Sequence, residues 1–166
     1  MDNGFQVFEQ VARSVSKLNY AEIERSQPEH PFELRNIHPD LPIKVQELFD
    51  DGHYPQSTFE AFKFVDREVA RLAASSESGF KLMMTVFSEN NPVVKLNDCN
   101  STSEKDEQRG FQFLFAGSIL AIRNPRGHEY AVRDSLDECL DHLALASILL
   151  RRLELAGHKL TAQIQS

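Results

Sequence analysis

The stretch FQFLFAGSILAIRNPRGH at residues 111–128 decides how this chain folds. Its first part, Phe111 to Ile122, places apolar side chains at helical spacing and predicts a buried helix. Pro125 lacks a backbone N–H and disfavours helical geometry in the residue before it. Gly127 permits backbone angles that are closed to other residues. The sequence therefore predicts that the helix breaks at Pro125 and that the chain turns there.

Helical patterns also fill most of the chain on both sides of this stretch. Ser101 with Glu104, and Ser135 with Glu138, form capping boxes, in which the Ser and Glu side chains satisfy backbone N–H groups at a helix start. Residues 90–100 show no helical period and read as an ordered loop. We expect helices over residues 3–18, from a cap at Asp40 to the Asp51-Gly52 turn, over 55–74 with Ser57 and Glu60 resembling a further capping box, over 79–88, from 101 to about 123, and from 135 to a stop at Gly157.

These helices predict an all-α protein, an up-and-down helical bundle with an N-terminal helical extension. We expect three parts: an N-terminal helix and linker at residues 1–30, the bundle at 31–157, and a loose C-terminal tail at 158–166. Gly110 and Gly117 lie inside a predicted helix, where each costs about 1 kcal/mol relative to Ala. That cost suggests that another helix or another chain approaches closely there.

Composition limits the classes of function. The chain has 166 residues, 41% of them hydrophobic, which is enough for one domain with a real core. Its net charge of -7 argues against a protein that coats polyanions, although a local basic patch could still bind nucleic acid. Cys99 and Cys139 form neither a metal pattern nor a disulfide framework, which fits a reducing cytoplasm. Neither a signal peptide nor a membrane-spanning run is evident, so we expect a cytoplasmic protein with no membrane partner.

Arg123 and His128 are the strongest candidates for a functional pair. On an unbroken helix, five steps of about 100° would leave them about 140° apart. The predicted break lets the chain double back and aim His128 toward Arg123. A permanent cation beside a group that titrates near neutrality suits phosphodiester cleavage. A plain helix-ending turn, with Asn124 as a cap and His128 at the surface, would give the same sequence pattern.

Other polar residues are weaker candidates. Arg126, Arg133 and Arg109 could contact the phosphate backbone of a nucleic acid, or could equally form surface salt bridges. Glu138 and His142 lie one turn apart and could share a metal, but no third ligand is evident, so a solvated helix face is the better interpretation. No metal and no cofactor is therefore expected.

The Arg123-Asn124-xxx-His128 pattern resembles the R-[polar]-xxx-H motif of the HEPN superfamily, whose members are helical bundles and often metal-independent ribonucleases. Other segments are similar to the Ymh family of prokaryotic proteins, which has been placed among HEPN domains. The resemblance covers roughly Ile37 to Arg152. It is carried by Asp51-Gly52-His53-Tyr54, Glu60-Ala61-Phe62, Gly79-Phe80-Lys81-Leu82-Met83, Gly110-Phe111 with Leu114-Phe115-Ala116-Gly117, and Ala121 to Glu129.

The resemblance implies an endoribonuclease of the prokaryotic defence or toxin type. It assigns the motif roles to Arg123, Asn124 and His128, and it implies a symmetric homodimer in which both motifs line one site. RNA would be cleaved by attack of its own 2′-OH, giving 2′,3′-cyclic phosphate and 5′-OH ends without a metal. An antitoxin or another regulatory protein would be a further partner. The runner-up is a catalytically silent dimeric module that binds RNA or a partner protein, and a third reading is a ligand sensor with residues 90–100 as a lid.

Overall fold

The computed structural model describes residues 7–9, 29–128 and 132–161. The chain divides into two compact units, Met1–Leu34 and Arg35–Ser166. In the first unit, residues 7–9 are helical and α3 (Pro31–Leu34) forms a single turn. The rest of the helix predicted at residues 3–18 lies outside the described residues.

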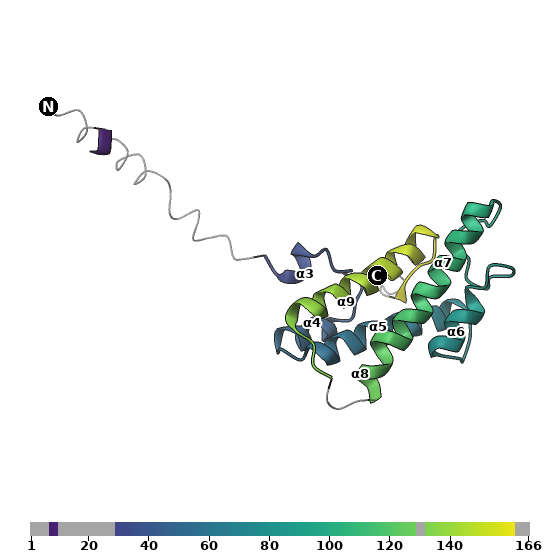
Figure 1. Cartoon of the computed structure of the whole chain (residues 1–166), viewed down its shortest axis with the longest axis horizontal. Coiled ribbons are helices and arrows are strands. Elements are labelled where there is room, and N and C mark those ends of the chain that lie inside the picture. The colour runs from purple at the N-terminus through teal and green to yellow at the C-terminus, as the bar shows by residue number, and fades with distance from the viewer. Residues whose placement is uncertain (1–6, 10–28, 129–131, 162–166) are drawn as a thin grey trace. The chain divides into compact units, whose positions relative to one another are not determined.

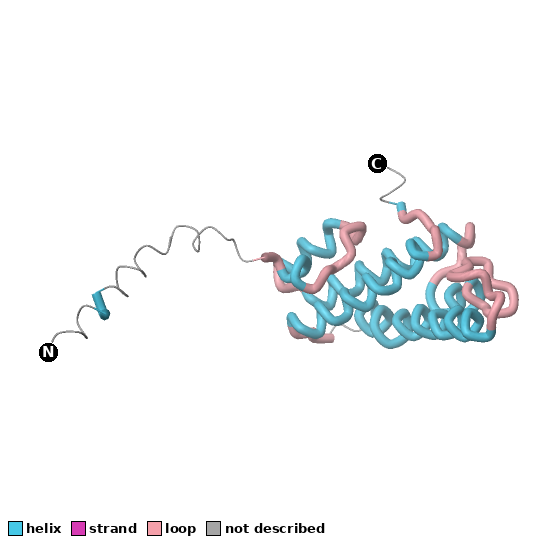
Figure 2. Tube along the Cα trace, turned by 90° about the horizontal axis from the view of Figure 1, so that it is seen from above, coloured by secondary structure: helices cyan, strands magenta, loops and turns pink. Residues whose placement is uncertain are grey.

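The second unit is helical throughout its regular elements, and no strand occurs in the part of the chain that the structure describes (Figure 2). This confirms the predicted all-α bundle. The elements are α4 (Ile43–Asp50), α5 (Tyr54–Leu72), α6 (Gly79–Val86), α7 (Thr102–Ser118), the π-helical η1 (Ile119–Arg123), α8 (Asn124–His128) and α9 (Leu136–Leu155).

Helix α5 is the centre of this unit. It packs against α4, α6, α9, η1 and α8, and α6 packs in turn on α7. Figure 1 shows that α7, η1 and α8 follow one another as a single long rod on one side of the bundle. The large side chains that are fully buried between these helices are Phe62, Phe87, Phe115, Leu82, Met83, Leu96, Ile119, Leu143, Leu149, Leu150, Leu153 and Leu160.

The helices predicted from about Pro55 and from Gly79 begin within one residue of those positions. Of the predicted helix caps, those at Ser101 and Ser135 are confirmed, and those at Ser57 and Asp40 are wrong. The capping boxes at Ser101 and Ser135 are both complete, with the Ser side chain accepting from the N3 backbone and the Glu side chain from the N-cap backbone. Ser57 instead lies inside α5 and donates its hydroxyl to the Val45 carbonyl at 2.8 Å, because the helix already begins at Tyr54. Asp40 does not cap α4, whose N-cap residue is Pro42.

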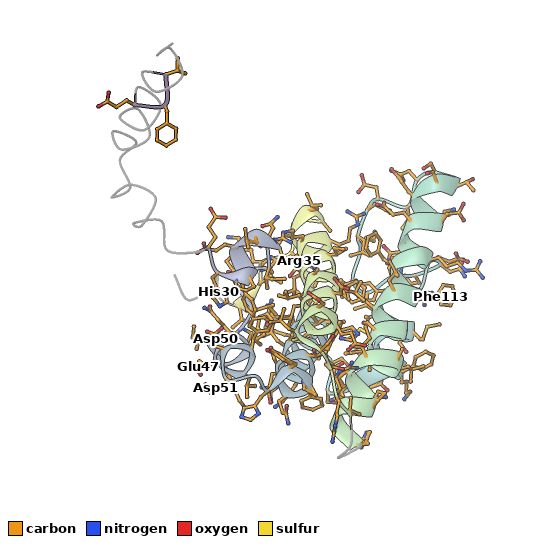
Figure 3. All side chains as sticks on the ribbon, turned by 60° about the vertical axis from the view of Figure 1, so that its left-hand side comes forward. His30, Arg35, Glu47, Asp50, Asp51 and Phe113 are labelled. Atoms are coloured by element: carbon orange, nitrogen blue, oxygen red, sulfur yellow. The ribbon has the colours of Figure 1, made fainter. Side chains whose placement is uncertain are left out.

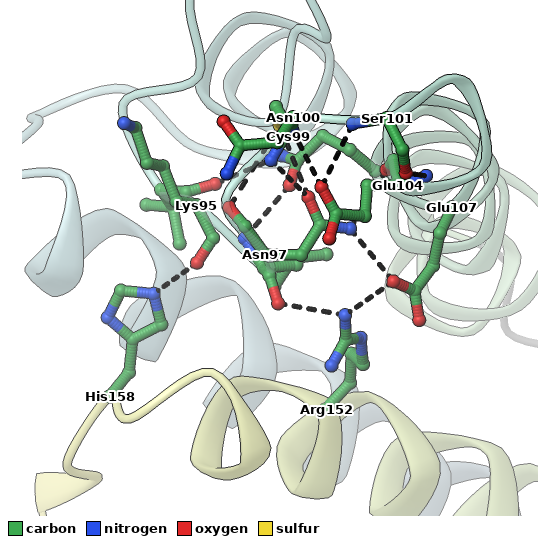
Figure 4. A network of polar contacts seen from close by, with 12 residues as sticks. Lys95, Asn97, Cys99, Asn100, Ser101, Glu104, Glu107, Arg152 and His158 are labelled. Carbon is green, nitrogen blue, oxygen red and sulfur yellow. Dashed lines mark hydrogen bonds and ion pairs between the residues drawn. The ribbon is translucent and has the colours of Figure 1, made fainter.

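The loop between α6 and α7 is fixed on the bundle. Buried Gln108 on α7 accepts from Leu96 N at 2.9 Å and donates to the carbonyls of Phe87 and Val94. Arg152 on α9 donates to the Leu96 carbonyl at 2.8 Å, within the polar network that Figure 4 shows. Beside this network lies a polar pocket of about 320 Å³ that none of the predicted site residues lines. A loop held by so many bonds does not suit the lid of a ligand sensor.

The chain after Gly157 is not the loose tail that we predicted, at least as far as Thr161. Leu160 is fully buried. Thr161 N donates to a carboxylate oxygen of buried Glu68 at 2.9 Å, and Arg71 donates to the Lys159 carbonyl at 2.6 Å. This segment packs on the bundle for two reasons. The apolar Leu160 side chain fills a position in the core, and the buried Glu68 carboxylate receives hydrogen bonds from Thr161.

Candidate functional site

The helix does not break at Pro125, so that prediction is wrong. Helix α7 continues through η1 into α8 and ends at His128. The η1 turn closes with a bond from Asn124 N to the Ile119 carbonyl, five residues back. Such a turn holds one more residue than an α turn. The wider turn lets Asn124, the residue before Pro125, stay helical with φ -64° and ψ -45°. Pro125 has no backbone N–H and therefore donates no hydrogen bond within the helix.

The unbroken helix changes how the two motif side chains relate. Arg123 and His128 stay five helical steps apart, which places them about 140° apart around the axis. Arg123 faces α5, whereas His128 is exposed at the end of α8. The predicted convergence of the two side chains within one chain is therefore wrong.

The Arg123 guanidinium is held on three sides. Its Cζ lies 5.5 Å from the centre of the Phe59 ring, and its Nη2 is 3.9 Å from Oδ2 of Asp66. Its Nη1 donates to Oδ1 of Asn124 at 3.1 Å. Its Nε is buried and has no hydrogen-bond partner among the described residues. The guanidinium is thus oriented, but its Nε–H donor is unused. A buried donor without a partner is uncommon in native proteins, so it marks this position as unusual.

Asp66 connects three helical elements at this point. Its carboxylate is buried, and Oδ1 accepts from Gly79 N at the start of α6 at 2.7 Å. Its other oxygen faces Arg123 on η1. Neither Asp66 nor Phe59 was predicted from the sequence to belong to the site. The one available signal was an acid beside the apolar stripe of α5, where Val65 and Val69 are buried.

Gly127 serves packing rather than a turn, which corrects the role predicted for it. It lies within α8, and a Cβ at this position would lie 2.7 Å from Cε2 of Phe59. The missing side chain therefore lets the Phe59 ring reach the helix that carries Arg123.

We expect Gly127→Ala to destabilise the protein. The added methyl group must displace the half-buried Phe59 ring, and overpacking costs about 1–3 kcal/mol. Because Ala forms a helix better than Gly by about 1 kcal/mol, we expect a net loss of about 1 kcal/mol. Urea unfolding measures the loss. The double variant with Phe59→Leu is the control, because a smaller side chain leaves room for the methyl group and should make the two changes less than additive. Full additivity would mean that the ring and the glycine do not share this space.

The remaining candidate arginines lie in different surroundings. Arg126 donates to both carboxylate oxygens of Asp134, at 2.7 and 2.5 Å, and to the Ile122 carbonyl at 2.8 Å. Its side chain is 9% exposed, so it fastens α8 to the segment before α9 and is not presented to a ligand. Arg109 precedes Arg123 by fourteen residues, or about 21 Å of helix. Arg133 is exposed next to Asp134.

His142 on α9 lies beside Arg126, with 3.4 Å between Nδ1 and Nη2. Burial and, next, the positive charge of Arg126 lower the pKa of His142. The Glu138 carboxylate accepts hydrogen bonds from the backbone N–H and the hydroxyl of Ser135. These two hydrogen bonds lower the pKa of Glu138. Residues 7–9, 29–128 and 132–161 contain no group of three or more His, Cys, Asp or Glu side chains placed to hold a metal.

The lowered pKa of His142 predicts a pH dependence of stability. Below the ordinary value of about 6.5, the unfolded chain binds a proton at this position more readily than the folded one. The free energy of unfolding should therefore fall as the pH is lowered through that value. Urea unfolding at several pH values should show a smaller fall for His142→Gln than for the wild type. An equal fall in both would show that other groups cause it.

A family model described as a protein of unknown function, Hypoth_ymh, matches residues 35–153. The chain belongs to the Ymh family. The match covers all the helices from α4 to the greater part of α9 and includes Arg123, Asn124 and His128. No curated protein and no solved structure matches this Ymh chain. Among its described residues, no helix combines the length and apolar character that crossing a membrane requires.

Proposed function

We propose that this Ymh chain is a metal-independent endoribonuclease of the HEPN type. The observation that carries the proposal is the Arg123 guanidinium, which Phe59, Asp66 and Asn124 orient while its Nε stays unpaired. It lies at the end of a π-helical turn, and such turns occur frequently at functional sites. His128 follows at the exposed end of the same rod.

The site needs two copies of the chain. Within one copy, Arg123 and His128 leave the helix in different directions, so one chain does not place both on the same phosphate. A two-fold dimer presents each side chain twice, and a symmetric interface brings the same patch of both subunits together. His128 from one subunit and Arg123 from its partner can then act on one substrate, which is a homodimer with a composite site.

The chemistry follows from the residues. RNA carries its own nucleophile, the 2′-OH beside each phosphate. One His128 accepts the proton of that hydroxyl as the oxygen attacks phosphorus, and the other donates a proton to the departing 5′ oxygen. Arg123 stabilises the negative charge on the non-bridging oxygens with its planar donors. The products are a 2′,3′-cyclic phosphate and a 5′-OH. Such an activity suits a toxin or defence protein acting on cellular or phage RNA, restrained by an antitoxin or other regulator.

A cleavage assay separates this proposal from a silent binding module. The wild type, Arg123→Ala and His128→Ala are each incubated with total RNA in EDTA, and RNA binding is measured in parallel. The proposal expects cleavage by the wild type alone, with binding retained by His128→Ala. Equal cleavage by all three proteins would show a contaminating nuclease and end the assignment.

One observation favours the second candidate, a non-catalytic dimeric module that binds RNA or a protein. Arg123 faces the buried carboxylate of Asp66, and neutralising that charge is a sufficient structural reason for an arginine at this position. This candidate expects RNA or protein binding without any product. It also expects Asp66→Asn, which removes the charge but can keep the acceptor for Gly79 N, to make Arg123→Met harmless to stability.

A further inference from the structure

A pair of basic side chains lies on α5 beside Arg123. We call this pair, Lys63 and Arg67, the α5 strip. Lys63 is half-buried and Arg67 is exposed, and the two lie one helical turn apart as neighbours on the helix surface. Lys63 Nζ is 5.8 Å from the centre of the Phe59 ring, and Arg123 Cζ is 5.5 Å from the same point. Positive groups from α5 and from η1 therefore gather around one ring.

The positive charge at the α5 strip exceeds the negative charge that it meets. Glu60 accepts hydrogen bonds from Lys63 at 3.1 Å and from Lys44 at 3.3 Å, so two cations share one carboxylate. Burial raises the pKa of Glu60, but the hydrogen bonds and charges of the two lysines lower it by more, so the carboxylate stays ionised. Arg67 takes part in no ion pair with any residue in the described part of the chain.

The nearby acidic residues face other groups. Figure 3 shows three acids on the side of α4 that is turned away from α5: Glu47, Asp50 and Asp51. On α5 itself, buried Asp66 faces Arg123. Glu68 is buried as well and pairs with Arg71 at 2.8 Å. The α5 strip thus keeps a local positive surplus, which lets a chain of net charge -7 bind a polyanion.

The α5 strip continues directly from the proposed site. Gly127 lies against Phe59, whereas Arg123, four residues earlier on the rod, faces Asp66. The rod and α5 therefore run in opposite directions, and the α8 end with His128 points toward the start of α5. A strand whose phosphate is held at Arg123 can continue along the α5 strip, on the side away from His128.

We propose that the α5 strip binds successive phosphates of the RNA strand that occupies the Arg123 site. The identity of this ligand rests on the proposed function. Lys63 and Arg67 are separated by about 6 Å along the helix axis, so each can contact a different phosphate. Like charges four residues apart destabilise a helix, and bound phosphates relieve that repulsion.

The salt dependence of RNA binding tests the α5 strip. Binding of a labelled single-stranded RNA is measured with His128→Ala as the parent, so that the RNA stays intact. Adding Lys63→Gln and Arg67→Gln should weaken binding at least about tenfold and reduce the slope of log K against log salt by about 1.4, because two phosphate contacts are lost. Lys95→Gln with Lys105→Gln is the matched control, since it removes the same charge from two exposed lysines elsewhere. It should keep the affinity and the slope of the parent.

Thermal unfolding shows whether a loss of binding reflects a loss of fold. The double variant of the α5 strip should be as stable as its parent, because Lys44 still pairs with Glu60 and a repulsive pair is removed. Arg67→Gln alone, at an exposed position, should reduce the salt slope by about 0.7. Equal weakening by the strip and control variants would overturn the proposal, and so would a parent that does not bind RNA.

Cleavage kinetics separate this inference from the proposed function. With His128 intact, the double variant of the α5 strip should raise KM and leave kcat unchanged, because the strip holds the strand equally well before and during the reaction. If the strip binds RNA but the wild type cuts none, this inference stands and the ribonuclease proposal fails. If the wild type cuts RNA and the strip variant has an unchanged KM, the ribonuclease proposal stands and this inference fails.

Discussion

Replacing His128 with alanine should lower the rate of the proposed RNA cleavage by about 10²- to 10⁴-fold, the usual contribution of a positioned general acid or base. We expect a large effect because, in the proposed mechanism, both proton transfers depend on the two copies of this one residue. His128 is exposed at the last position of α8 and is not part of the core, so folding should be unaffected. Single-turnover cleavage of a labelled RNA measures the rate, and circular dichroism checks the fold.

His53→Ala is the control for this experiment. His53 is also exposed and also lies at a helix end, before α5, where its side chain makes no cap hydrogen bond. It should cleave RNA at the wild-type rate. If the two histidine variants were equally active, or equally impaired, His128 would have no special part in the reaction and the proposed chemistry would be wrong.

Arg126→Ala should destabilise the protein by about 3–5 kcal/mol, the usual cost of removing one partner from a buried ion pair. The side chains of Arg126 and Asp134 are 9% and 3% exposed, and two hydrogen bonds join them. Without the arginine, the carboxylate of Asp134 stays buried with no counter-charge from it. The variant also loses the bond to the Ile122 carbonyl inside η1, so the rod end that carries His128 should loosen.

Urea unfolding measures this loss, and an exposed ion pair supplies the control. Arg35 and Asp141 pair at 3.1 Å, but their side chains are 46% and 69% exposed. Arg35→Ala should therefore cost less than about 1 kcal/mol. Replacing both members of the buried pair by apolar residues of similar volume, as in Arg126→Met with Asp134→Leu, should recover much of the loss. Equal costs for Arg126→Ala and Arg35→Ala would contradict the structural role given to Arg126.

Local chemistry explains what the sequence could predict about the fold. The capping boxes at Ser101 and Ser135 involve residues three apart, so their signal is complete in the sequence. The same pattern at Ser57 misled, because the Val45 carbonyl on a neighbouring helix takes up its hydroxyl. The break predicted at Pro125 is also wrong, because the π-helical turn before it lets the helix continue through the proline. The local sequence rules for proline do not include this arrangement.

The candidate site was predictable only in part, for a related reason. Arg123, Asn124 and His128 were predicted from a short motif, which can be recognised in the sequence without knowing how the helices pack. Phe59 and Asp66 belong to a helix more than fifty residues earlier in the chain, and only the fold brings them to Arg123. Whether an arginine is exposed or locked in an ion pair, as Arg126 is, depends on the same long-range contacts.

The most direct measurement is the chemistry of the ends that the protein leaves on RNA. A defined oligonucleotide is cut in EDTA, and both products are analysed by mass spectrometry, with a second oligonucleotide carrying a single 2′-deoxy sugar at the cut position. We predict 2′,3′-cyclic phosphate and 5′-OH ends, and no cut beside the 2′-deoxy sugar. Ends with a 5′-phosphate, or equal cutting of both oligonucleotides, would contradict attack by the 2′-OH and with it the site assigned to Arg123 and His128.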